Sequence, residues 1–316
     1  MAYEVCQSNR KPGSLELIDI PIPVPDFGRF LSVWLLKDFI RDRIVLVETG
    51  PAVTVPILVE ELKKREVRNI DYIICTHVHL DHTGGLGQFL NAYPQGKIIC
   101  PKRGRAHLMD PARLWEGSLS VLGDVARIYG EPCPVSETAL YSMEKLSEGI
   151  EEIDTPGHSP HHSSYLYDLD GKKILFVGEA AGVCIRVEGE GPYLRPATPP
   201  RFHYETARKS LLALQDVGAD IICYPHYGAF EEPKQLLSLA LAQLDFWWEL
   251  VCDLDAQGMD VDAMHPIVIV QDPLLRSLDK LEGREPLRER RFIRQSLMGF
   301  IGAVREHKET QNKIQY

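Results

Sequence analysis

The sequence THVHLDHTGG, which spans Thr76 to Gly85, places three histidines and one aspartate within six positions. It directly follows residues 73–75, Ile-Ile-Cys, whose apolar, β-branched character is typical of a buried strand. His77 and His79 are two positions apart and point to the same side of an extended segment, so both imidazoles can converge on one ion. The stretch therefore predicts a metal site at the end of a strand.

Asp81 and His82 follow the start of a turn, so their register differs from that of the first two histidines. We expect them to face a second ion rather than crowd the first. A lone histidine is usually packed or solvated, but these residues have no structural need to be together, and imidazole with carboxylate is what Zn²⁺ or Fe²⁺ prefers. Gly84 and Gly85 then allow close backbone approach as the chain turns.

The pattern His-x-His-x-Asp-His followed by Gly-Gly resembles the metallo-β-lactamase superfamily of metal-dependent hydrolases, in its glyoxalase II-like branch or an archaeal or bacterial relative. The resemblance implies an α/β fold, an αββα sandwich in which two sheets lie face to face with helices outside. It also implies a dinuclear metal site at one edge of the sandwich.

Composition restricts the classes of function. The 316 residues are 44% hydrophobic and 25% charged, as in ordinary soluble proteins, and the net charge of −10 makes nucleic acid a poor partner. No apolar run approaches the roughly 20 residues of a membrane span. Met1 to Ser14 lacks the pattern of a signal peptide, and seven scattered cysteines without a Cys-x-x-Cys pair indicate reduced thiols, so the cytoplasm is expected.

The rest of the chain predicts two domains. Residues 1–230 are expected to form the catalytic domain, with a helical insertion at about 103–130. Residues 231–316 read as a helical extension packing on it, because leucines and aromatic residues recur there at helical spacing. Five arginines within 284–294 predict a solvated helix face, with an anion site or an oligomer contact as alternatives. The predicted strands are 15–20, 31–36, 43–47, 71–75, 97–100, 165–168, 173–177 and 221–223, and the predicted helices are 53–65, 204–217, 235–254 and 287–304.

A second motif spans Asp154 to Ser163 and reads DTPGHSPHHS. Its Pro-Gly turn can aim His158 at the edge where the first cluster lies. The segment resembles the superfamily's Pro-Gly-His-Thr-Pro-Gly-His, which implies that His158 is the third imidazole of the first ion. The same match implies that His162 is a buried hydrogen-bonding residue.

Two glutamates stand where the superfamily usually has aspartate. Glu48 precedes Thr-Gly, in the place of an aspartate that supports the metal loop; a turn with a solvated carboxylate is the alternative. Glu179 follows Gly178, in the place of an aspartate that bridges both metals, and its longer side chain must be absorbed by the loop or by the ions. His226 follows the last buried strand, where the family places the final ligand of the second ion.

The resemblance thus implies one ion held by His77, His79 and His158, a second held by Asp81, His82 and His226, and Glu179 between them. The expected ions are two Zn²⁺, with Fe or Mn as alternatives. A hydroxide bridging them would attack an electrophilic carbonyl or phosphorus, with Asp81 orienting it and passing a proton to the leaving group.

The predicted function is hydrolysis of a small ester, thioester or lactone. No Gly-x-Ser-x-Gly elbow, dinucleotide-binding or Walker loop occurs, so no further cofactor-binding residue is expected and the metal carries the chemistry. The expected partner is a small-molecule substrate, with neither nucleic acid nor membrane, and a homo-oligomer stays open.

Two alternatives remain. One is an iron-dependent oxidoreductase resembling di-iron oxygen or nitric oxide reductases or persulfide dioxygenases. The di-iron relatives usually carry Glu where this chain has His79, and no flavin-binding domain follows His226. The other is a non-catalytic protein whose metal only holds the fold.

Overall fold

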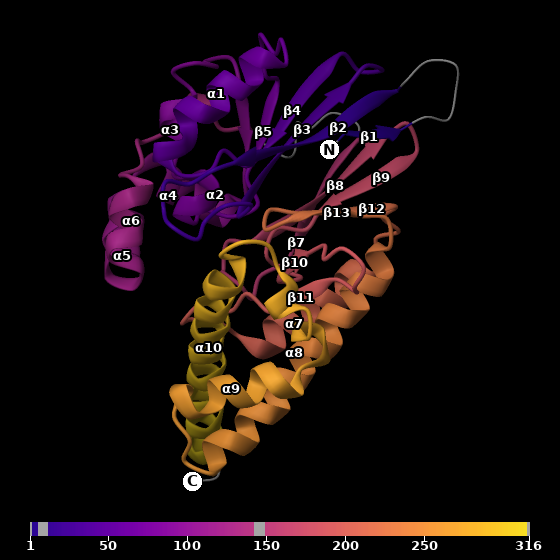
Figure 1. Ribbon diagram of the computed structural model, residues 1–316. Coiled ribbons are helices and arrows are strands. Elements are labelled where there is room, and N and C mark those ends of the chain that lie inside the picture. Colours follow the sequence, from indigo (N-terminus) through magenta and orange to yellow (C-terminus); the bar gives the residue numbers. More distant parts are fainter. Residues whose placement is uncertain (1, 6–11, 142–148, 315–316) are drawn as a thin grey trace. The chain divides into compact units, whose positions relative to one another are not determined.

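The computed structural model describes residues 2–5, 12–141 and 149–314, and Figure 1 labels their helices and strands. The chain divides into two compact units. Unit 1 comprises residues 1–154, 161–178 and 219–231, and unit 2 comprises residues 155–160, 179–218 and 232–316. The predicted catalytic domain, residues 1–230, therefore takes segments from both units.

The first sheet of unit 1 has the strand order β1-β2-β3-β4-β5-β6. Its strands are β1 (Ala2–Val5), β2 (Gly13–Ile20), β3 (Leu31–Asp38), β4 (Arg43–Val47), β5 (Tyr72–Ile74) and β6 (Lys97–Ile99). The first four pair antiparallel, as an opening meander, whereas β4, β5 and β6 pair parallel. Parallel neighbours need a crossover, and helix α1 (Val55–Lys64) supplies it between β4 and β5. The five strands and the helix predicted for this region are confirmed, and only the short β1 was missed.

The second sheet of unit 1 has the order β13-β12-β9-β8-β7. Its strands are β7 (Ile150–Asp154), β8 (Ser163–Leu169), β9 (Lys172–Phe176), β12 (Ile221–Tyr224) and β13 (Gly228–Phe230). A hairpin joins β8 to β9, both of which the sequence predicts, through Asp170 and Gly171, whose φ values of 54° and 81° match the twist of a two-residue turn. The three-residue β13 was missed because so short a segment carries no periodic pattern.

The two sheets pack face to face. Their buried facing residues are Leu15, Trp34, Leu36, Val45, Val47, Ile74 and Ile99 from one sheet and Tyr165, Tyr167, Leu169, Ile174, Phe176, Ile221, Cys223 and Ala229 from the other. Two polar groups of this layer are hydrogen-bonded across it: the Trp34 indole donates to the Tyr224 carbonyl at 3.1 Å, and the Tyr167 hydroxyl donates to Asp38 at 2.8 Å. The predicted α/β class and two-sheet sandwich are confirmed.

The described residues of unit 1 form six α-helices: α1, α2 (Leu80–Thr83), α3 (Leu86–Phe89), α4 (Arg105–Met109), α5 (Ala112–Leu122) and α6 (Asp124–Tyr129). Helix α1 is amphipathic and buries Val55, Leu58 and Leu62. Helices α4 to α6 occupy the segment predicted as a helical insertion, and Figure 1 shows α5 and α6 at the periphery of unit 1. No residue of α5 is fully buried.

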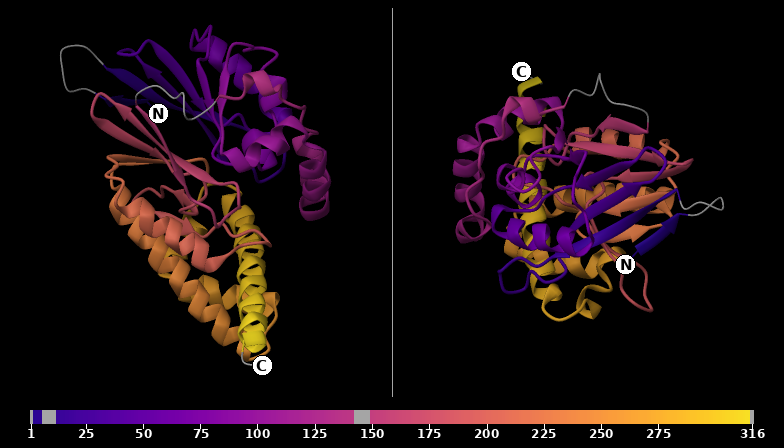
Figure 2. Two further views of the ribbon diagram at one scale, coloured as in Figure 1. Left: turned by 180° about the vertical axis from the view of Figure 1, so that it is seen from behind. Right: turned by 90° about the horizontal axis from the view of Figure 1, so that it is seen from above.

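Unit 2 is mainly helical. It contains the short hairpin of β10 (Val183–Ile185) and β11 (Tyr193–Arg195), together with α7 (Tyr204–Gln215), α8 (Pro233–Ala256), α9 (Val261–Gln271) and α10 (Glu285–Ile314). Helix α8 packs on α7 and on α10, and the left view of Figure 2 shows α10 alongside it. The predicted C-terminal helical extension is confirmed. None of the described helices is long and apolar enough to cross a membrane.

Three features of unit 2 differ from expectation, the first being the hairpin of β10 and β11, which was not predicted. Helix α9 was missed because its sequence MHPIVIV is apolar all round and contains Pro266, so it lacks a helical period. The prediction of a solvated arginine face on 284–294 is wrong for Arg288, whose side chain is 1% exposed. Its Nε donates to Glu289 at 2.9 Å, so this arginine is part of the interior.

Candidate metal centre

The loop that carries the first cluster is held by the backbone around it. Strand β5 ends at Ile74, and the N–H groups of Thr49 and Gly50 both donate to the His82 carbonyl, at 2.9 and 3.0 Å. The Gly85 N–H donates to the Gly50 carbonyl at 2.8 Å, and a Cβ at Gly85 would lie only 3.0 Å from that oxygen. The close approach expected at this glycine is present.

Glu48 lies directly behind the loop. Its Oε1 accepts hydrogen bonds from the Thr76 N–H at 3.1 Å and the Thr76 hydroxyl at 2.5 Å, and lies 3.8 Å from His82 Nδ1. Burial raises the pKa of the Glu48 carboxyl, and the neighbouring His82 and Thr76 offset this only in part. The side chain is 1% exposed, so the alternative of a solvated carboxylate in a turn is wrong.

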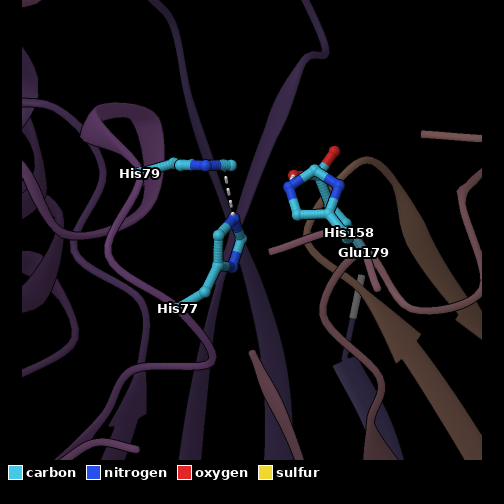
Figure 3. Close-up of side chains that lie close together, drawn as sticks. All are labelled: His77, His79, His158 and Glu179. Atoms are coloured by element: carbon cyan, nitrogen blue, oxygen red, sulfur yellow. Dashed lines mark hydrogen bonds and ion pairs between the residues drawn. The ribbon is translucent and has the colours of Figure 1, made fainter. Parts of the chain in front are cut away.

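His77 and His79 present ring nitrogens to each other. His77 Nε2 lies 3.1 Å from His79 Nδ1, as Figure 3 shows, while His77 Nδ1 lies 3.0 Å from the Thr76 hydroxyl. Two nitrogens bound to one tetrahedral ion at about 2.0–2.1 Å would be separated by about 3.3 Å. The spacing of the two rings therefore suits a shared ion, as the two-residue interval predicts.

Asp81, His82 and His226 form a second group. Each offers one ligand atom, and the three atoms lie within 4.8 Å of one another. Asp81 Oδ2 is 3.7 Å from His82 Nε2 and 3.5 Å from His226 Nε2. The Phe30 carbonyl lies 2.8 Å from His226 Nδ1, so this ring directs its other nitrogen toward Asp81.

His158 and Glu179 form a pair within unit 2. His158 Nε2 lies 2.9 Å from Glu179 Oε2, and Figure 3 shows the imidazole beside the carboxylate. His158 Nδ1 is 2.9 Å from the Ala197 carbonyl, the same arrangement as at His226. Gly157 precedes His158 with φ 141°, and a Cβ there would lie 2.5 Å from Ala207 Cα, so glycine is required for this approach.

Two further histidines, His161 and His162, and one glycine, Gly178, lie around the loop in unit 1. His162 is fully buried, and its ring centroid lies 5.1 Å from that of His77. A Cβ at Gly178 would lie 2.3 Å from His162 Nε2, so this glycine lets the chain pass the ring just before Glu179. His161 is half-buried, with its ring 5.9 Å from that of His79 and 5.7 Å from that of His107.

The donor set fits divalent transition metals. Neutral imidazole and carboxylate suit Zn²⁺, Fe²⁺ and Mn²⁺, and the backbone carbonyls beside Nδ1 of His158 and His226 favour the tautomer that leaves Nε2 for an ion. Glu48, His77 and His82 form another closely spaced group. Because Thr76 already donates twice to Glu48 Oε1, this carboxylate is better suited to supporting the loop than to binding an ion.

Sequence reasoning missed the backbone groups that orient the candidate ligands His158 and His226. These groups are the backbone carbonyls of Phe30 and Ala197, which no side-chain pattern in the sequence can indicate. Each carbonyl also lies far along the chain from the histidine that it contacts. Thr76 did carry a signal, because its hydroxyl lies one residue from His77 and next to the carboxylate predicted at Glu48.

The sequence is similar to those of known proteins. Residues 27–226 match the family model described as the metallo-beta-lactamase superfamily. A metallo-beta-lactamase fold-containing protein of Sulfurisphaera tokodaii is 30% identical over 196 residues, which cover 56% of this chain and 70% of that protein. A hydroxyacylglutathione hydrolase of Psychromonas ingrahamii is 28% identical over 157 residues, 49% of each chain. The match thus spans about half the length of that hydrolase.

Solved structures share the fold. An archaeal metallo-beta-lactamase superfamily protein from Sulfolobus tokodaii aligns with a TM-score of 0.61 at 22% identity, covering 92% of this chain and 98% of that one. A metallo-beta-lactamase family protein from Thermus thermophilus aligns with a TM-score of 0.60 at 19% identity, covering 93% and 94%.

Proposed function

The chain belongs to the metallo-β-lactamase superfamily, and from this membership we propose that it is a metal-dependent hydrolase of a small ester, thioester or lactone. The observation that carries the proposal is the group of Asp81, His82 and His226, whose three ligand atoms converge within 4.8 Å. Metal binding would explain why two buried imidazoles and a half-buried carboxylate converge, because divalent metals prefer these ligands.

We assign the ligands as the motifs imply. His77, His79 and His158 would hold one ion, Asp81, His82 and His226 would hold the other, and the Glu179 carboxylate would be a ligand between them. The 3.1 Å approach of His77 to His79 and the 2.9 Å approach of His158 to Glu179 support the assignment, because both pairs have the spacing of ligands on one ion. Zn²⁺ is the expected metal, with Fe and Mn as alternatives.

The residues have distinct tasks. Bound divalent ions would polarise the substrate carbonyl and lower the pKa of water. Asp81 is 20% exposed, whereas His226 is 3% exposed and His82 is fully buried, so the Asp81 carboxylate is the group that can orient water and move a proton. Glu48 and Thr76 keep the loop in place behind them.

The substrate class rests on charge and on the relatives. A net charge of −10 disfavours a polyanionic substrate, and the relatives named hydroxyacylglutathione hydrolases support an acyl substrate. We therefore place a small acyl compound ahead of a phosphodiester.

The experiment combines metal analysis with a hydrolysis screen. The purified protein is expected to contain close to two divalent ions per chain and to cleave at least one activated ester, thioester or lactone. Asp81→Asn and His226→Ala should each lose bound metal and activity. His203→Ala, which removes an exposed histidine, should lose neither.

Two results would overturn the proposal. One is full metal content and activity in both ligand variants. The other is stoichiometric iron with oxygen consumption and no hydrolysis, which would replace hydrolysis with redox chemistry on the same ligands.

A further inference from the structure

We infer that Ser296 and Gly299, on the C-terminal helix α10, are positioning residues of the metal centre that set the orientation of His158 toward Glu179. The inference rests on the proposed function, in which His158 and Glu179 are metal ligands. All of the contacts that carry it lie within unit 2.

The orientation of His158 depends on one backbone carbonyl. Its Nδ1 lies 2.9 Å from the Ala197 oxygen, which leaves Nε2 facing Glu179 at 2.9 Å. On the other side, Gly157 is pressed against Ala207, so the backbone before the ring has little freedom. A shift of the Ala197 carbonyl would therefore rotate the ring or break its hydrogen bond, and ligand orientation controls metal affinity.

The segment that carries this carbonyl lies outside any sheet. Strand β11 ends at Arg195, and the following residues 196–200 read Pro-Ala-Thr-Pro-Pro, with few N–H groups available for pairing. Two side-chain hydrogen bonds join this segment to α10. The Ser296 hydroxyl donates to the Pro196 carbonyl at 2.9 Å, and the Thr198 hydroxyl donates to the Ser296 carbonyl at 2.8 Å. One residue of the helix thus fixes both neighbours of Ala197.

Gly299 brings the helix backbone against the same segment. A Cβ at this position would lie 2.3 Å from the Thr198 carbonyl oxygen and 2.8 Å from that of Pro199. Both are backbone atoms, so a side chain could be accommodated only by moving the segment or the helix. Glycine at 299 is therefore what allows the close approach.

A stripe along α10 extends these contacts to β11. Arg195 Nε lies 2.5 Å from Glu289 Oε2, and the Arg195 guanidinium lies 4.8 Å from the centroid of the Phe292 ring. Glu289, Phe292, Ser296 and Gly299 follow one another at intervals of three or four residues, so they share one face of the helix. This face runs along the segment from Arg195 to Pro199.

The alternative is that α10 stabilises unit 2 by packing alone, without any effect on the ligands. Substituting each of two glycines on α10 by alanine can distinguish these two explanations. A Cβ at Gly302 would lie 3.6 Å from the Pro200 oxygen, an ordinary contact, whereas a Cβ at Gly299 cannot be placed without displacement. Both Gly→Ala substitutions favour the helix to the same degree, because both positions lie in its interior.

The test measures Zn²⁺ affinity of the metal-free full-length chain by competition with a chromophoric chelator, with the visible spectrum of bound Co²⁺ as a second readout. Gly302→Ala is expected to match the wild type in both and to melt at a higher temperature. Gly299→Ala should bind Zn²⁺ at least tenfold more weakly and show an altered Co²⁺ spectrum, while its circular dichroism stays that of a folded protein. His158→Ala is the reference for loss of the ligand itself.

The outcomes are distinguishable. If His158→Ala binds both ions like the wild type, the ligand assignment in the proposed function fails. If His158→Ala loses affinity but Gly299→Ala matches Gly302→Ala, the positioning role is overturned.

A second pair of variants applies if Gly299→Ala does not fold. Ser296→Ala removes the shorter of two hydrogen bonds to the Pro196 carbonyl and leaves the 3.3 Å bond from Arg195, and Ser238→Ala removes an exposed serine that donates to its own helix at 2.8 Å. Weaker Zn²⁺ binding in Ser296→Ala alone supports the inference, and equal affinity in the two variants refutes it.

Discussion

Replacing Glu289 by glutamine should destabilise the protein strongly although it changes the shape of the side chain little. Glu289 is 1% exposed and contacts two buried guanidinium groups, Arg195 at 2.5 Å and Arg288 at 2.9 Å. The Tyr193 hydroxyl donates to the same carboxylate at 3.2 Å. Glutamine keeps a carbonyl acceptor but removes the negative charge that both guanidinium groups face.

The magnitude follows from burial. Removing one partner of a buried ion pair typically costs about 3–5 kcal/mol, because the remaining charge stays desolvated without compensation. Folded proteins are stable by only about 5–15 kcal/mol, so the loss is a large fraction of the total. We expect the free energy of unfolding at pH 7 to fall by about 3 kcal/mol or more.

The pH dependence has a definite sign. Burial by itself would raise the pKa of Glu289, but Arg195 and Arg288 outweigh it and hold the pKa below the usual 4.5. A carboxyl whose pKa is lowered by folding stabilises the protein above its unfolded-state pKa, and that contribution disappears as the pH falls through the folded-state pKa. The difference in stability between wild type and Glu289→Gln should therefore be constant at neutral pH and shrink on acidification below about pH 4.5.

Urea unfolding followed by tryptophan fluorescence measures this effect, because Trp247 and Trp248 lie on α8 of the same unit. Glu60→Gln is the control, since it removes an exposed carboxylate that is 3.5 Å from Lys63 and should change stability little. An unfolding free energy of Glu289→Gln within about 1 kcal/mol of the wild type at pH 7 would refute the argument for a strong buried pair.

Three other measurements test the site and the interior. Glu179→Asp shortens the side chain and withdraws the carboxylate from its 2.9 Å contact with His158. We expect this variant to bind less metal, although aspartate is the residue usual in the family. An unchanged metal content would show that the loop shifts to compensate for the shorter side chain. Removing metal with a chelator should lower the melting temperature. Zn²⁺ added back at about 100 times its dissociation constant should raise the free energy of unfolding by about 2.7 kcal/mol. A melting temperature that is the same with and without metal would contradict binding to the folded state. A thiol reagent should modify exposed Cys133 quickly and Cys100 slowly, because burial raises the pKa of the Cys100 thiol to about 12; the reverse order of modification would contradict the burial.

A structural feature could be predicted from the sequence when the residues that form it are close together along the chain. The cluster at 76–85 is local, so its histidines, its glycines and the preceding strand could be read directly. Glu48 and Glu179 were found by position in a motif, which gave their place but not their contacts. The buried pair of Arg195 and Glu289 joins residues 94 positions apart, and in the sequence both look like ordinary surface charges.

The half-buried place of His161 was also missed, for a different reason. Its neighbours His79 and His107 come from separate segments, and only the folded chain brings the three rings together. Propensity and spacing describe single elements, whereas such contacts depend on how elements pack.

The contact between Ser296 and the segment around Ala197 also has a consequence for biosynthesis. His158 leaves the ribosome well before residues 296–299 are made, about 140 positions later in the chain. Until that helix is present, the carbonyl that orients the imidazole is not held in place. Under the proposed ligand assignment, we therefore expect metal to bind at this histidine only late in synthesis, and chains whose synthesis stops before residue 296 should emerge poorly metallated.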